Sequence, residues 1–237
     1  MYRPANQCRL RETKRLGISA VKSFWLVSKK FTQRRRDAEM IWLSRYTALA
    51  EVSHMTTKPE ATVDDLYHVP EHGKAELING ELVLIPPTGG VPGRAAGKIF
   101  ISLSEYETRV GGGYAFPDNV GFIVNLPHRR SFSPDTAFFK GELRGSLFLE
   151  GAPVFAVEVR SSDDYGPAAE RRMAQKRADY FAAGTLVVWD VDVLREKVVR
   201  VCRSTDPDTP TVYGLSDIAE ALPALPGWEM RVDSIFS

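Results

Sequence analysis

The sequence predicts one α/β domain over residues 55–237, and three observations support that prediction. Short apolar runs rich in β-branched and aromatic residues, at 153–159 and 185–192, have the length and composition of buried strands. Apolar side chains recur at helical spacing over 98–110 and 166–184. The chain of 237 residues is 43% hydrophobic and 26% charged, which is close to the globular average and supplies enough apolar material for a core.

Local signals define the first elements of this domain. Thr62 is a suitable N-cap for a short helix over 64–69, which carries two acidic residues in its first turn. Residues 74–85 alternate like two strands joined at the Asn-Gly dipeptide 79–80, which is typical of tight hairpins. Residues 86–93 are rich in Pro and Gly and predict a loop before the first long helix.

The remaining elements follow in chain order. The first long helix is expected over 98–110 and ends at a run of three glycines. Pro167 near its start and Gly184 just past its end bound the second helix, over 166–184. The chain after residue 202 is rich in Pro and Asp and predicts mainly turns. Strands are expected near 114–116, 120–126, 133–139, 153–159, 185–192 and 196–202.

Composition argues against several classes of protein. No stretch approaches the roughly 20 uninterrupted apolar residues of a membrane span, so no membrane-spanning segment is expected. The two cysteines cannot build a disulfide framework, and the four histidines lack metal-ligand spacing. Because the sequence shows no secretory signal, the cytoplasm is the expected compartment.

Charge divides the chain at about residue 54. Residues 1–54 carry a net charge of +8, whereas residues 55–237 carry a net charge of −7. A basic N-terminal extension, disordered or outside the fold, is therefore expected before an acidic domain. Three interpretations of the extension stay open. It could be an arm that binds nucleic acid or anionic lipid, or an Arg-rich targeting segment. It could also be translated upstream sequence before a natural start at Met55, or a loosely attached helical extension.

Two carboxylates stand where charge is costly. Asp135 follows Pro134 at the start of an apolar strand, and Glu158 lies inside the most apolar strand. A buried charge costs several kcal/mol unless it is paired or binds a metal. Carboxylates at the ends of adjacent strands could share one Mg²⁺ ion, which prefers oxygen ligands and keeps several waters. The alternative is that Asp135 caps a turn and Glu158 pairs with Arg160.

Lys176 is a third charge in a partly apolar setting. At about 100° per residue it lies on the same helix face as Met173 and Tyr180, and away from the solvent face expected to hold Arg172 and Asp179. A lysine there can bury its stem and extend its ammonium to water. It can also be held near a metal site, where it would orient water or stabilise developing negative charge.

Five segments occur in an order and spacing that resemble a known family. They are ELINGEL, SPDTAFF, AVEVRSS, KRADYFAAG and VVWDVD, and the resemblance extends from about Met55 to Phe236. Together they resemble the Uma-two family of restriction-endonuclease-like proteins, in the PD-(D/E)XK nuclease superfamily. The resemblance implies a restriction-endonuclease-like core, in which a central mixed β-sheet is flanked by helices. It also implies a Mg²⁺-dependent endonuclease that could use Mn²⁺ instead. The expected partner is nucleic acid, and DNA is expected before RNA.

The family motif can be carried over residue by residue. Asp135 and Glu158 match the carboxylates that bind the metal, and Lys176 matches the lysine that assists the attacking water. Glu76 matches an acidic residue of the early hairpin that is often counted with the catalytic site. In the superfamily's usual pattern the lysine lies two residues after the glutamate, where this sequence has Arg160.

Two other functions stay open. The chain could be a catalytically degenerate module that binds nucleic acid or protein, since residues 88–98 lack the histidine that many members carry before the first long helix. It could also hydrolyse another phosphoester. The oligomeric state is open as well, and a homodimer is one option because many nucleases dimerise to cut two strands. The candidate phosphate contacts are Arg129, Arg130, Arg171, Arg172 and Arg177.

Overall fold

A six-stranded mixed sheet forms the centre of the domain in the computed structural model, which describes residues 59–69 and 73–237. The strand order is β11-β10-β9-β8-β6-β3. β8 and β9 pair in parallel and all other neighbours pair antiparallel, which gives the mixed sheet that the family resemblance implied. The strands are β3 (Tyr114–Phe116), β6 (Thr136–Phe139), β8 (Phe155–Val159), β9 (Val187–Asp192), β10 (Val198–Arg203) and β11 (Asp206–Tyr213).

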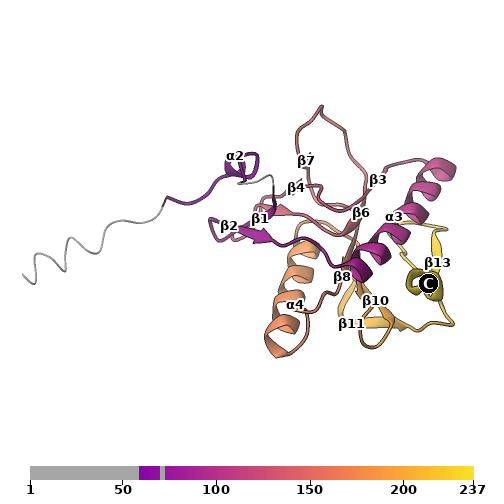
Figure 1. Ribbon diagram of the computed structural model, residues 1–237. Helices are drawn as coiled ribbons and strands as arrows, with labels where there is room; N and C mark the ends of the chain where they lie inside the picture. The colour runs from indigo at the N-terminus through magenta and orange to yellow at the C-terminus, as the bar shows by residue number, and fades with distance from the viewer. Residues whose placement is uncertain (1–58, 70–72) are drawn as a thin grey trace, which may run out of the picture. The chain divides into compact units, whose positions relative to one another are not determined.

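Two long helices cover opposite faces of this sheet (Figure 1). α3 (Gly90–Val110) packs on the face that carries Phe155 and Val157 of β8. α4 (Pro167–Ala182) connects the parallel strands β8 and β9 and packs on the face that carries Ala156. Neighbouring residues of β8 therefore point to different layers, as a pleated strand requires. This alternation places Glu158 on the α4 face.

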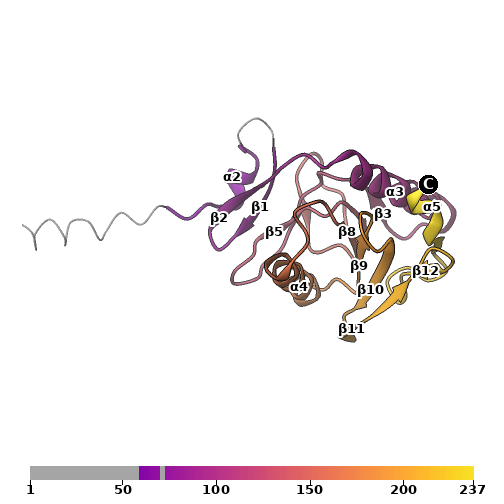
Figure 2. The ribbon, with the colours of Figure 1, turned by 60° about the horizontal axis from the view of Figure 1, so that its bottom comes forward.

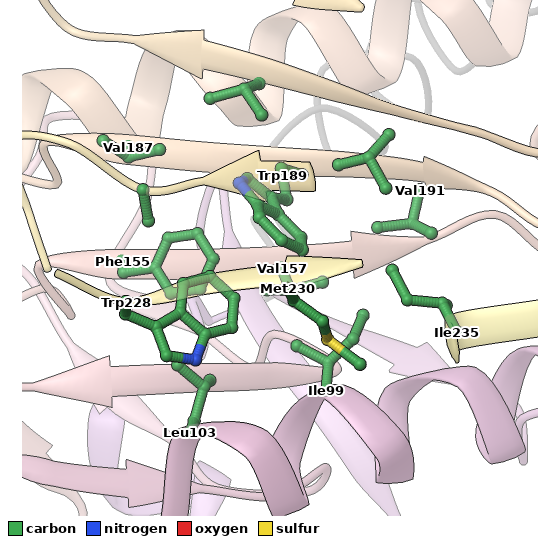
Figure 3. Close-up of a cluster of buried hydrophobic side chains, with 14 of the residues drawn as sticks. Ile99, Leu103, Phe155, Val157, Val187, Trp189, Val191, Trp228, Met230 and Ile235 are labelled. Atoms are coloured by element: carbon green, nitrogen blue, oxygen red, sulfur yellow. The ribbon is translucent and has the colours of Figure 1, made fainter. Parts of the chain in front are cut away.

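The core under α3 is built around aromatic side chains (Figure 3). The Trp189 ring lies 5.5 Å from Phe155 and 4.9 Å from Trp228, measured between ring centroids. Ile99 and Leu103 reach this cluster from α3 and are fully buried. Trp228 belongs to the C-terminal segment, so the last residues of the chain complete the core and end beside α3 (Figure 2).

Small elements surround the central sheet. Thr62 and Asp65 form a capping box at α2, and the tight turn between β1 and β2 has positive φ angles of 50° at Asn79 and 70° at Gly80. Both the cap and the hairpin were predicted from the sequence. The remaining elements are α2 (Val63–Leu66), β1 (Lys74–Ile78), β2 (Glu81–Ile85), β4 (Phe122–Ile123), β5 (Ser131–Phe132), β7 (Leu149–Glu150), β12 (Ile218–Glu220), β13 (Glu229–Arg231) and α5 (Val232–Phe236).

The largest differences from the sequence predictions are at α3 and β11. α3 begins at Gly90, within the predicted loop. Pro92 is compatible with the helix because it lies in the first turn, where backbone N–H groups have no hydrogen-bond partner within the helix. Residues 206–213 form strand β11 although they are rich in Pro and Asp. β11 is the edge of the sheet, where a proline can be accommodated without breaking a central ladder.

Two further predictions concern the chain as a whole. The basic extension 1–54 lies outside the described residues. Within 59–69 and 73–237, no helix is long and apolar enough to cross a membrane.

Two glycines give a test of how tightly the domain is packed. An added Cβ at Gly97, in the middle of α3, meets nothing within 4 Å. Gly97→Ala is therefore expected to stabilise the domain by about 0.5–1 kcal/mol, since alanine favours the helix. An added Cβ at Gly113 would lie 2.6 Å from the carbonyl oxygen of Phe139 and against the Phe138 ring.

Gly113→Ala is accordingly expected to destabilise the domain by about 1–3 kcal/mol, because the backbone must shift to admit the methyl group. Urea unfolding followed by circular dichroism measures both variants. The packing described here would be contradicted if the two substitutions changed the free energy of unfolding in the same direction.

Candidate active site

Strand register places two carboxylates opposite each other. Thr136 of β6 pairs with Val157 of β8, so the preceding residue, Asp135, faces Glu158. The backbone N–H of Val159 donates a hydrogen bond of 2.7 Å to Asp135 Oδ2, which fixes this carboxylate against β8. Directly opposed side chains on one face of antiparallel strands lie close together. Asp135 and Glu158 are thus neighbours on the α4 face of the sheet.

α4 supplies two side chains that contact Glu158. Lys176 Nζ lies 2.8 Å from Glu158 Oε2, and the Tyr180 hydroxyl donates a hydrogen bond of 2.7 Å to Glu158 Oε1. Residues four apart on a helix share a face, which explains why both reach the same carboxylate. The side chains of Glu158 and Lys176 are 23% and 20% exposed, so the pair can still be reached from solvent.

Glu76 reaches the same lysine from β1. Its Oε1 lies 2.9 Å from Lys176 Nζ and accepts a 3.0 Å hydrogen bond from the backbone N–H of Ser133. Its Oε2 accepts a 2.5 Å hydrogen bond from Arg129 Nη1. The Lys176 ammonium therefore lies between the carboxylates of Glu76 and Glu158, which come from different strands.

Arg129 ties Glu76 back to α4. Its Nε donates a 2.7 Å hydrogen bond to Asp179 Oδ2. Asp179 also accepts hydrogen bonds of 2.8 Å each from Gln175 Nε2 and from His128 Nε2, if that ring nitrogen carries the proton. The arginine and both of its carboxylate partners are almost completely buried. This network fixes one turn of α4 against β1 and the segment before β5.

Asp135 has a cationic neighbour of its own. Lys74 Nζ of β1 lies 3.4 Å from Asp135 Oδ1 and 2.5 Å from Asp118 Oδ1. Thr88 donates a 3.3 Å hydrogen bond to the other oxygen of Asp118. The Asp118 side chain is 38% exposed, whereas Lys74 and Asp135 are mostly buried.

Electrostatics within the cluster oppose the ionisation of Glu158. Burial raises the pKa of Glu158, and the nearby charges of Asp135 and Glu76 raise it further, against the lowering effect of Lys176. Burial also acts to raise the pKa of Glu76, but Lys176, Arg129 and the Ser133 N–H outweigh it and hold that pKa below its usual value. Burial and the neighbouring carboxylates therefore disfavour the negative charge on Glu158.

The donor set fits a hard divalent cation. The cluster holds three cationic side chains, Lys74, Arg129 and Lys176, and five carboxylates that pair with them, so the carboxylates outnumber the cations. The five carboxylates are those of Glu76, Asp118, Asp135, Glu158 and Asp179. Among residues 59–69 and 73–237, no group of three or more His, Cys, Asp or Glu is arranged to hold a metal. Mg²⁺ does not need such a cage, because it is commonly held by one or two carboxylates together with waters and substrate phosphate.

The geometry also corrects three sequence-based interpretations. Arg160 does not pair with Glu158; its guanidinium binds Asp190 at 2.7 Å and Glu170 at 2.5 Å. Asp179 is buried rather than on the solvent face, because Arg129 and its neighbours bind it. Arg129 is buried and doubly paired, so it is not an available phosphate contact.

Other candidate phosphate contacts stay accessible. Arg130, Arg171 and Arg172 are exposed, and Arg177 is partly so. Sequence reasoning assigned no role to Tyr180, Lys74 or Asp118. The one available signal was for Tyr180, which follows Lys176 by one helical turn within the KRADYFAAG segment.

The buried Asp179 leads to a prediction for stability against pH. Burial would raise its pKa, but hydrogen bonds from Arg129, Gln175 and His128 outweigh burial and lower it from the usual 3.8. A carboxyl whose pKa is lower in the folded than in the unfolded state stabilises the fold above the unfolded pKa, and that stability is lost as pH falls. Wild-type stability should therefore fall below about pH 4 more steeply than that of Asp179→Asn.

Urea unfolding between about pH 3 and pH 6 measures this difference. Asp179→Asn can lower stability at every pH. The decisive quantity is therefore how steeply the free energy of unfolding changes with pH, and not the constant difference between the two proteins. Parallel curves for the two proteins would contradict the assigned role of Asp179.

Known proteins resemble this chain in sequence and in fold. The Uma2 family, described as "Putative restriction endonuclease", matches residues 62–233. A solved structure from Anabaena variabilis, titled a "putative nuclease belonging to DUF820", aligns with a TM-score of 0.59 and 19% identity. The alignment covers 74% of this chain and 97% of that one. No curated protein matches the chain.

The structural alignment supports the restriction-endonuclease-like fold, and the family match covers all four segments that carry Glu76, Asp135, Glu158 and Lys176. By that match the chain belongs to the Uma2 family of restriction-endonuclease-like nucleases.

Proposed function

We propose that this protein is a metal-dependent endonuclease that hydrolyses phosphodiester bonds in DNA. The observation that carries the proposal is the convergence of four charged groups from separate elements: Asp135 before β6, Glu158 in β8, Lys176 in α4 and Glu76 in β1. Buried charges in such number are costly to a fold. Their assembly at a partly exposed point is therefore better explained by chemistry than by stability.

Asp135 and Glu158 would hold Mg²⁺, or Mn²⁺ in its place. Each carboxylate oxygen has two lone pairs, so both groups keep acceptor capacity beyond the hydrogen bonds they accept. Those bonds come from Val159 and Lys74 to Asp135 and from Lys176 and Tyr180 to Glu158. A divalent ion bound there supplies Lewis-acid chemistry, in that it polarises the scissile phosphate and lowers the pKa of a bound water. The Val159 N–H and the Tyr180 hydroxyl keep the two carboxylates in place.

Lys176 would serve the reacting groups directly. Its ammonium lies 2.8 Å from Glu158, and an ammonium has three donors. With two of them directed at Glu158 and Glu76, a third can donate to the attacking water or to a phosphate oxygen. Its positive charge offsets the negative charge that develops on the phosphate in the transition state. Exposed Arg130, Arg171 and Arg172 are available to bind flanking phosphates.

The proposal is tested with the full-length chain and three substrates: linear, supercoiled and single-stranded DNA. Each is incubated with Mg²⁺, with Mn²⁺ or with EDTA. Cleavage that requires a divalent ion and is abolished by EDTA is the expected result. Binding of DNA without cleavage in any metal would instead identify a module that has the nuclease fold but has lost the activity.

A further inference from the structure

Four charged side chains form a closed ring next to the catalytic carboxylates. Glu76 binds Lys176 through Oε1 at 2.9 Å and Arg129 through Oε2 at 2.5 Å. Arg129 in turn binds Asp179 at 2.7 Å. Asp179 follows Lys176 by three residues on α4, so one turn of the helix closes the ring. We refer to these four residues as the charged ring.

The Arg129 side of the ring is held rigidly. Arg129 forms a backbone bridge to Ile78 at the end of β1, and its guanidinium lies 4.9 Å over the Phe132 ring. The backbone N–H of Ser133 holds Glu76 independently. A guanidinium also presents its donors in a fixed planar fork, so it can bind two carboxylates in one defined geometry. The position of Arg129 is thus determined by backbone and packing, and through Nη1 the arginine fixes the second oxygen of Glu76.

Lys176 is the flexible member of the ring. A lysine ammonium is a point charge on a four-carbon stem, and one carboxylate alone leaves it free to take several positions. Glu76 provides the second contact that fixes it beside Glu158. Both oxygens of Glu76 are occupied by three donors, from Ser133, Lys176 and Arg129. Glu76 therefore has less free acceptor capacity than Asp135 or Glu158, and its contact with Lys176 anchors the lysine.

We propose that Arg129 is a positioning residue for Lys176: through Glu76 and Asp179 it holds the ammonium at the catalytic carboxylate. The inference rests on the proposed function for its catalytic consequence, but the positioning itself is a property of the folded chain. Without the arginine, Glu76 loses one of its two cations, and α4 loses the link to β1 that runs through Asp179, Arg129 and Glu76. Lys176 then samples positions away from Glu158.

Lysine labelling tests the positioning without any nuclease activity. Full-length Arg129→Lys keeps the positive charge but cannot donate to Glu76 and Asp179 as a fork does. Reductive methylation followed by mass spectrometry compares the labelling rate of Lys176 with that of exposed Lys197 in each protein. Relative labelling of Lys176 is expected to rise several-fold in Arg129→Lys. Asp179→Asn removes the negative charge from the Arg129–Asp179 contact, and a rise in Lys176 labelling is expected there too should Arg129→Lys fail to fold.

Arg160→Lys is the matched control. Arg160 is as buried as Arg129, at 6% side-chain exposure for each, and it also binds two carboxylates, Asp190 and Glu170. Both of these carboxylates lie outside the charged ring, so labelling of Lys176 should stay unchanged in Arg160→Lys. Equal labelling of Lys176 in wild type and folded Arg129→Lys, or an equal rise in Arg160→Lys, would overturn the proposal.

Kinetics then separate positioning from general damage to the fold. For DNA cleavage at saturating Mn²⁺, kcat of Arg129→Lys is expected to fall about 10- to 100-fold, because small displacements of a catalytic group are costly. KM and the Mn²⁺ affinity should stay within about twofold. A kcat unchanged in Arg129→Lys would contradict the catalytic role. If wild type cleaves no DNA while the labelling responds as expected, the proposed function fails and the positioning stands.

Discussion

Replacing Lys176 with methionine is expected to reduce the rate of DNA cleavage by about 10²- to 10⁴-fold. Methionine keeps much of the apolar stem and removes the ammonium that lies 2.8 Å from Glu158. The water and the scissile phosphate would then lose the positive charge that lies against Glu158. Because the lysine competes with a metal for the same carboxylate, the affinity for Mn²⁺ should not weaken. Initial cleavage rates and calorimetric titration with Mn²⁺ measure the two effects separately.

Two variants make this result specific. Glu158→Gln should lose both cleavage and Mn²⁺ binding, since the amide keeps the shape of the side chain but not its charge. Lys197→Met removes an exposed lysine outside the cluster and should cleave within about twofold of wild type. A Lys176→Met protein that cleaves at the wild-type rate would refute the assignment of this lysine.

Replacing Trp189 with alanine is expected to destabilise the domain by about 3–5 kcal/mol, the largest change in stability that we predict for a single substitution. The side chain is fully buried between Phe155 and Trp228 in the core under α3. Its indole N–H donates a 3.0 Å hydrogen bond to the Glu220 carbonyl, which would lose its partner. The lost aromatic contacts, the unpaired carbonyl and the cavity left by the indole all lower the free energy of unfolding.

Urea unfolding followed by far-UV circular dichroism measures this loss, because the signal does not depend on the deleted tryptophan. Val212→Ala is the control: Val212 is 54% exposed on edge strand β11, and its truncation should change stability by less than about 0.5 kcal/mol. Similar losses from the two substitutions would show that the aromatic cluster is not the centre of the core.

The sequence alone predicted the elements that carry the site. Asp135 and Glu158 were recognisable because Asp135 stands at the start of an apolar strand and Glu158 lies inside one, and Lys176 because it lies on a partly apolar helix face. These signals are local, and a charge in an apolar setting is visible without knowledge of the fold. The register between β6 and β8 then brought the two carboxylates opposite each other, as predicted for the ends of adjacent strands.

The parts that could not be predicted depend on distant partners. Arg129 and Asp179 are 50 residues apart, and neither stands in an apolar segment that would indicate burial. Helical spacing predicts the angle between side chains around α4, but not how much of the helix surface is buried by the rest of the domain. Asp179 is buried because Arg129, from a distant part of the chain, packs against it. Strand β11 was missed for a similar reason, since only its place at the sheet edge allows its prolines.

The central claim is that Asp135 and Glu158 jointly hold a divalent cation beside Lys176. Crystals of the full-length protein soaked in Mn²⁺ test it directly through the anomalous scattering of manganese. A peak about 2 Å from one oxygen of Asp135 and one of Glu158 is the predicted result. No peak between these two carboxylates, in crystals where Mn²⁺ binds elsewhere on the chain, would contradict it.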